Sequence, residues 1–140
     1  MGVRYLYTTL NSGHIIADTD TFLHEGSKAW PDSKGTRWND DEDGTDADIL
    51  LTPDGASTVI SHFNDNRLIS VSGADFEEAA DIAVWVRSLN PDPHLVLWFT
   101  TDNFDGHTVL TPGITPQQVI EQWVDHREHD PYVEYPEYFS

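Results

Sequence analysis

The residues best placed to do chemistry are the carboxylates between Asn39 and Asp48, where six acidic residues fall within nine positions. Such a run could hold calcium in an EF-hand loop, which needs glycine at position six and a bidentate glutamate at position twelve. If Gly44 takes position six, positions one, three and five are Asn39, Asp41 and Asp43. Position eight is then Asp46 instead of an apolar residue, and position twelve is Leu50. We therefore expect no calcium loop. The run is a solvated acidic loop, a weak cation site or a recognition surface for a basic partner.

The seven histidines are the next candidates, and none is arranged as H-E-x-x-H. His126 and His129 are three residues apart after a predicted helix and would share a face only if the helix ran through them. A surface charge cluster explains this pair better than a weak metal site. His107 stands at the start of a strand, where we expect a satisfied edge residue. The pattern predicts no metal centre.

The motifs of the common enzyme classes are missing from the sequence. There is no cysteine, which excludes a thiolate nucleophile and a cysteine-ligated zinc. There is no G-x-S-x-G elbow and no glycine-rich phosphate loop. Carboxylates are so numerous that choosing one pair as general acid and base would be arbitrary. We expect neither an enzyme nor a cofactor.

The balance of 7 basic against 25 acidic residues gives a net charge of −18. A chain this acidic has no basic face for nucleic acid and no basic patch for anionic lipid. No apolar run approaches the roughly 18 residues of a membrane span, and the N-terminal stretch does not have the pattern of a signal peptide. We expect a soluble cytoplasmic protein without direct contact to membrane or nucleic acid. Its charge either keeps it in solution or meets a positive partner.

The aromatic residues fall into three groups. The first, in the predicted helices and central strand, is expected in the core: Trp85, Trp98 and Trp123. The second, Trp30 and Trp38, lies in a predicted loop and either pins that loop or forms exposed anchors. The third alternates with glutamates in the C-terminal tail: Tyr132, Tyr135, Tyr138 and Phe139. Aromatics among carboxylates suit a protein interface, but the tail could equally fold back on the domain or be a disordered end.

Secondary structure follows from periodicity and composition. Runs of β-branched, aromatic and aliphatic residues predict strands at 3–9, 48–52, 56–63, 67–72, 94–101 and 107–111, and 14–22 could pair with the first of them. The run 94–101 is apolar enough for a central strand buried on both faces. Turns are expected at 53–55 and 64–66.

Two main helices are predicted. The first spans about 74–90, capped by Ser72 or Asp75, with apolar residues at three- and four-residue spacing. The second spans about 115–126, with Thr115 as its cap and Pro116 at its first position. The prolines of the tail are expected to exclude helix there.

These elements predict an α+β fold with a mostly antiparallel sheet of about six or seven strands. Residues 1–125 would form a single domain, interrupted by a long acidic loop at 23–48. Residues 126–140 would form an acidic, aromatic tail.

The stretch 75–125 contains a helix, an apolar strand, an Asp-Gly turn, a second strand and a helix in PGITPQQVIEQWVD. This third of the chain resembles small acidic proteins of actinobacteria that are often encoded as immunity partners of secreted polymorphic toxins. The resemblance implies a non-enzymatic inhibitor that binds its toxin tightly. It carries over no functional residue.

The function expected on these grounds is an immunity protein, or antitoxin, that blocks the basic cleft of a toxin. An acidic surface would be steered into such a cleft by long-range attraction. The hypothesis requires negative charge to gather on one face beside exposed aromatic rings. The residues expected to contact the partner are Trp30, Trp38, Asp40, Asp41, Glu42, Asp43, Asp46, Asp48, Tyr132, Glu134, Tyr135 and Tyr138.

Two alternatives share the electrostatics. One is a phage-type DNA mimic that inhibits a nucleic-acid-binding protein. The other is an ordinary domain of a halophile, in which the acidity serves solubility and the charge is spread evenly.

Overall fold

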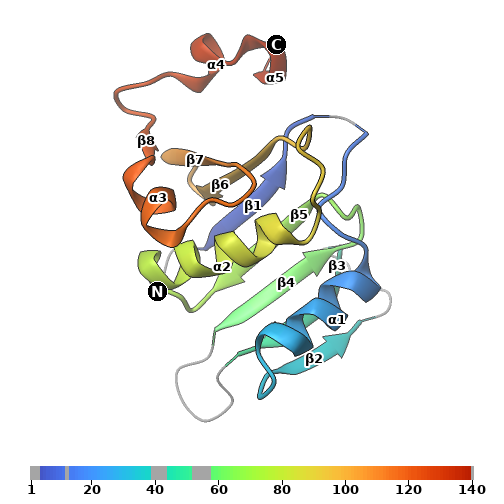
Figure 1. Ribbon diagram of the computed structural model, residues 1–140. Coiled ribbons are helices and arrows are strands. Elements are labelled where there is room, and N and C mark those ends of the chain that lie inside the picture. The colour runs from blue at the N-terminus through green and yellow to red at the C-terminus, as the bar shows by residue number, and fades with distance from the viewer. Residues whose placement is uncertain (1–3, 12, 39–43, 52–57, 140) are drawn as a thin grey trace.

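The computed structural model describes residues 4–11, 13–38, 44–51 and 58–139. The strands within these residues form one antiparallel sheet (Figure 1). Its strand order is β2-β3-β4-β5-β1-β6-β7-β8. The strands are β1 (Tyr5–Thr9), β2 (Lys34–Arg37), β3 (Thr45–Leu50), β4 (Val59–Phe63), β5 (Leu68–Ser72), β6 (Leu97–Thr101), β7 (Gly106–Leu110) and β8 (Val124–Asp125). The α+β class and the antiparallel sheet are confirmed, with slightly more strands than expected.

The helices begin at residues that satisfy free backbone donors. They are α1 (Thr19–Ala29), α2 (Phe76–Ser88), α3 (Pro116–Glu121), α4 (Pro131–Glu134) and α5 (Pro136–Phe139). Asp18 and Asp75 cap α1 and α2 by accepting hydrogen bonds from backbone N–H groups three residues later. Thr115 caps α3 in a reciprocal capping box. The predicted helix at 74–90 and the caps at Asp75 and Thr115 are confirmed.

Helices α1, α2 and α3 lie on one face of the sheet (Figure 1). The Tyr7 hydroxyl of β1 donates to the Ala79 carbonyl of α2 at 2.7 Å. The ring of Phe22 in α1 lies 5.9 Å from that of Trp85 in α2, so the two helices share this face. Between the helices and the sheet lies the main core, to which Ile49, Ile60, Ile69, Val71, Ala83, Val86, Leu97 and Phe99 contribute.

The second face of the sheet is covered differently at its two ends. Among the described helices, only the tail helices α4 and α5 lie on this face. Their aromatic rings contact β6 and β7, where Tyr135 lies 4.9 Å from Trp98. No described helix covers the second face over β2 to β5. Side chains such as Thr36, Ser61 and Leu68 are partly accessible to solvent there.

The predictions for residues 14–22 and 23–48 are wrong. Residues 14–22 do not pair with β1, and the segment expected to be a long loop contains most of α1, all of β2 and the start of β3. Glycine and polar residues give α1 low intrinsic helix propensity. The helix is stabilised by packing, because Phe22 and Gly26 are buried and a Cβ at Gly26 would lie within 3.0 Å of Ile49.

The predictions near the C-terminus need two further corrections. The last main helix ends at Glu121, not at 126, and Val124–Asp125 returns to the sheet as β8. The prolines of the tail do not exclude helix: Pro131 and Pro136 each stand at the start of a single helical turn, where their missing N–H is not needed. The turn at 64–66 is present, while the turn expected at 53–55 lies outside the described residues.

Candidate partner-binding surface

Trp38 is the exposed aromatic residue that follows edge strand β2. Its side chain is 45% exposed, and its indole Nε1–H donates to Asp48 Oδ2 at 2.8 Å. Asp48 Oδ1 accepts a second hydrogen bond from the Ser61 hydroxyl at 2.7 Å. Asp48 and Ser61 face each other on β3 and β4. Two strands therefore hold this indole in one orientation on the second face of the sheet.

Asp46 faces the opposite way from Asp48 because the β3–β4 register shifts between Thr45 and Ala47. Such a bulge places an extra residue opposite one partner and redirects its side chain. Asp46 Oδ1 lies 2.6 Å from His62 Nδ1, and its Oδ2 accepts from the Thr19 hydroxyl at 2.8 Å. Asp46 thus joins the start of α1 to the sheet, and its carboxylate is already bound by the protein's own groups.

His62 is a fully buried residue that the sequence analysis did not single out. Its Nδ1 faces the Asp46 carboxylate, and its Nε2 lies 2.7 Å from the carbonyl oxygen of Ala17. Both ring nitrogens of His62 therefore have a partner, one on β3 and one in the segment that precedes α1. The alternation in β4 could have indicated that His62 is buried, because residues two apart in a strand share a face and Ile60 is also buried.

Trp30 packs inside the domain, unlike Trp38. Its ring lies edge-on to Trp85 with a centroid distance of 4.7 Å, and it is half-buried against the core. It also caps the end of α1, where its backbone N–H donates to the carbonyl of Gly26. Packing accounts for this tryptophan, which leaves Trp38 as the exposed indole of the pair.

The acidic residues expected beside Trp38 are only partly described. Asp46 and Asp48 have internal partners, and Asp40, Asp41, Glu42 and Asp43 lie outside the described residues. Elsewhere, exposed carboxylates occur on every described helix and on several turns, among them Asp20, Asp65, Glu77, Asp102, Glu121 and Glu137. The described carboxylates are therefore spread over the molecule instead of gathering on one face, and residues 40–43, which the hypothesis places beside Trp38, are not among them.

The tail is at the far edge of the sheet from Trp38. Strands β2 and β8 are the two edges, so about 34 Å of sheet separates them at about 4.8 Å per strand. Tyr135 and Tyr138 pack edge-on against Trp98, while Tyr132 is 60% exposed. Glu134 accepts from His129 Nδ1 at 3.1 Å. The tail folds back on the domain, and the sheet does not bring its residues together with Trp38.

His107 is a buried residue of β7, which pairs with both β6 and β8, so the expectation of an edge residue is wrong. Its ring stacks on Trp98 with a centroid distance of 3.7 Å. Its Nδ1 lies 2.8 Å from His126 Nε2. His126 and His129 do not share a helix face, because the helix has ended before them.

The chain was compared with protein-family models, curated proteins and solved structures, and none of them matches it. In the part of the chain that the structure describes, no group of three or more histidines and carboxylates is arranged to hold a metal ion. The described helices are all too short or too polar to span a bilayer.

Proposed function

We propose that this chain is a non-enzymatic acidic binding protein: a cytoplasmic immunity protein, or antitoxin, that occupies the basic cleft of a cognate toxin. The observation that carries this proposal is Trp38, a large indole fixed by Asp48 and left 45% exposed. Tryptophan is among the residues that most often dominate the binding energy of protein interfaces.

The support of Trp38 favours a role in binding. An aromatic side chain that is already held in one orientation loses little conformational entropy when a partner covers it. Thr36, Asp48 and Ser61 lie beside it on the second face of β2, β3 and β4, which the described helices leave open. This open half of the sheet provides a surface of mixed polar and apolar character around the indole.

The net charge of −18 supplies the selectivity for a basic partner. Because the described carboxylates surround the molecule, their field attracts a positive surface from a distance instead of forming one contact patch. Residues 40–43, four consecutive carboxylates that follow Trp38 in the chain, add negative charge next to the indole in sequence. Association should therefore be fast at low salt and slow markedly as salt rises.

The experiment is a growth-rescue assay with the products of the genes flanking this one. Each product is expressed in a bacterial host with and without this chain, and any toxic product is purified with it. We expect rescue of growth and a stoichiometric complex. Its association rate should fall at least tenfold between about 50 and 500 mM salt, because added salt shortens the distance over which charges attract each other.

Trp38→Ala should abolish rescue, and Ile120→Ala is the control. Ile120 is an exposed apolar residue of α3, which lies on the other face of the sheet from Trp38. Rescue that survives Trp38→Ala, or that both variants lose equally, would count against this surface. A set of flanking products that are all non-toxic or all unbound would count against the immunity role.

A further inference from the structure

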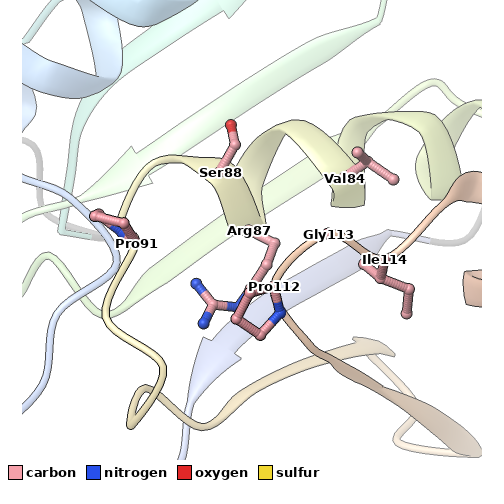
Figure 2. Close-up of a pocket in the computed structure, with 7 residues that line it drawn as sticks. All are labelled: Val84, Arg87, Ser88, Pro91, Pro112, Gly113 and Ile114. Atoms are coloured by element: carbon pink, nitrogen blue, oxygen red, sulfur yellow. The ribbon is translucent and has the colours of Figure 1, made fainter.

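A cavity of about 240 Å³ lies between the second half of α2 and the segment that follows β7 (Figure 2). It is lined by Val84, Arg87, Ser88, Pro91, Pro112 and Ile114. Figure 2 shows Val84 and Ile114 toward one end and the guanidinium group of Arg87, between Pro91 and Pro112, toward the other. The cavity therefore has an apolar end and a cationic end.

Arg87 is only 3% exposed, although it carries a full charge. Its Nε donates to the carbonyl of Leu110 at 3.1 Å, Nη1 to that of Asn90 at 2.5 Å, and Nη2 to that of Asp92 at 2.9 Å. All three acceptors are neutral. A guanidinium group has five N–H donors. Three are used in these bonds, so one N–H of Nη1 and one N–H of Nη2 can each donate a further hydrogen bond.

No carboxylate of the described residues lies within ion-pair distance of Arg87. The carboxylate of Asp92 is engaged elsewhere, since its Oδ1 accepts from His94 N at 2.9 Å and its Oδ2 lies 3.6 Å from His14 Nε2. Burial lowers the pKa of Arg87, and attraction to Asp92 opposes this only in part. Buried charges in proteins are normally paired, so a buried cation without an ion-pair partner is unusual in a chain with this excess of carboxylates.

We propose that this cavity binds a small monocarboxylate with a short apolar body. The carboxylate would accept hydrogen bonds from Nη1 and Nη2 of Arg87, as in a two-point arginine–carboxylate pair. The apolar body would contact Val84, Pro112 and Ile114. At about 30 Å³ for each water-sized group, the cavity accommodates roughly eight or nine non-hydrogen atoms, the size of hexanoate or benzoate. A single negative charge suits the site, because the net charge of −18 on the chain repels a dianion more strongly than a monoanion.

The test is titration of the intact chain with benzoate, and with benzamide as the neutral probe of the same shape. Binding is followed by calorimetry and by backbone amide shifts in NMR spectra. We expect saturable binding of benzoate at least tenfold tighter than that of benzamide, since hydrogen bonds to a charged group are stronger than neutral ones. The shifted amides should cluster at 84–92 and 110–114. The proposal would be overturned if benzoate did not bind, if the two probes bound with equal affinity, or if the shifted amides lay only in other regions.

Variants separate the cavity from general anion binding. Val84→Trp should fill the apolar end and weaken benzoate binding at least tenfold, while the three hydrogen bonds of Arg87 stay in place. Ile120→Trp, at an exposed position of α3, is the matched control and should bind benzoate as the parent does. Unchanged binding by Val84→Trp would overturn the proposal. Arg87→Met is less informative on its own, because losing three buried hydrogen bonds can unfold the protein.

Discussion

His107 Nδ1 lies 2.8 Å from His126 Nε2, and His126 Nδ1 lies 2.7 Å from the carbonyl oxygen of Phe104. The carbonyl can only accept, so a neutral His126 ring donates from Nδ1 and accepts at Nε2. His107 must then donate from Nδ1, which leaves its Nε2 unprotonated. That nitrogen is buried and has no hydrogen-bond partner in the described structure. A further proton on His107 would therefore place a charge where nothing nearby accepts it.

This relationship predicts that stability falls with acidification. Burial, followed by the charges of His126 and His129, lowers the pKa of His107 from 6.5 to about 4. Between these two values the unfolded chain binds a proton at this position and the folded protein does not. The contribution of His107 to the free energy of unfolding should therefore fall as pH is lowered from 6.5 to 4, by up to about 3 kcal/mol.

Urea unfolding at pH 7 and pH 4.5 measures that loss. His107→Gln retains a donor toward His126 but does not titrate, so its stability should depend less on pH than that of the parent. His24→Gln changes an exposed histidine of α1 and should keep the parental dependence. A parental pH dependence in His107→Gln would contradict the assignment.

The two tryptophans of the first half of the chain should differ in what they stabilise. Trp30→Ala removes an indole packed on Trp85 and the core, and we expect a loss of about 2–4 kcal/mol. Trp38→Ala removes a largely exposed ring with one hydrogen bond, and we expect about 1 kcal/mol. Chemical denaturation ranks the two variants. A larger loss for Trp38 would show that its main role is structural and would weaken the proposed function.

Asp46 should matter more than Asp20, an aspartate whose partner is exposed. Its carboxylate lies at hydrogen-bond distance from the fully buried His62 and from the Thr19 hydroxyl, so Asp46→Ala removes a partner from both and should cost about 1–3 kcal/mol. Asp20 pairs with Arg37 on the surface, and Asp20→Ala should cost at most about 1 kcal/mol. Equilibrium unfolding of the two variants in parallel tests this difference. Similar losses would mean that the Asp46–His62 pair is not a principal link between α1 and the sheet.

Gly106 has no room for a side chain. A Cβ there would lie within 3.0 Å of three atoms of the Trp123 indole, which packs directly over this residue. Gly106→Ala should therefore cost about 1–3 kcal/mol through overpacking. In a Trp123→Leu background the same substitution should cost much less, and the double-mutant cycle measures the coupling. An unchanged cost in that background would place the strain elsewhere.

Much of the fold could be predicted from the sequence because its signals are local. Alternating β-branched and aromatic residues mark β1, β4 and β5, and the continuous apolar run marks the buried β6. Asp75 and Thr115 cap their helices by bonding backbone groups only three residues away. The helix α1 was missed because its stability comes from contacts with distant residues and not from its own propensity.

The sequence by itself determined the fold class, most strands, the start of two helices and the excess of negative charge, all of which depend on residue type and near neighbours. The tertiary structure alone decided that Trp30 is packed and Trp38 exposed, and that the tail lies at the opposite sheet edge. It also decided that His62, Arg87 and His107 are buried. Burial and proximity depend on which residues far apart in the chain are brought together, and no local pattern encodes that.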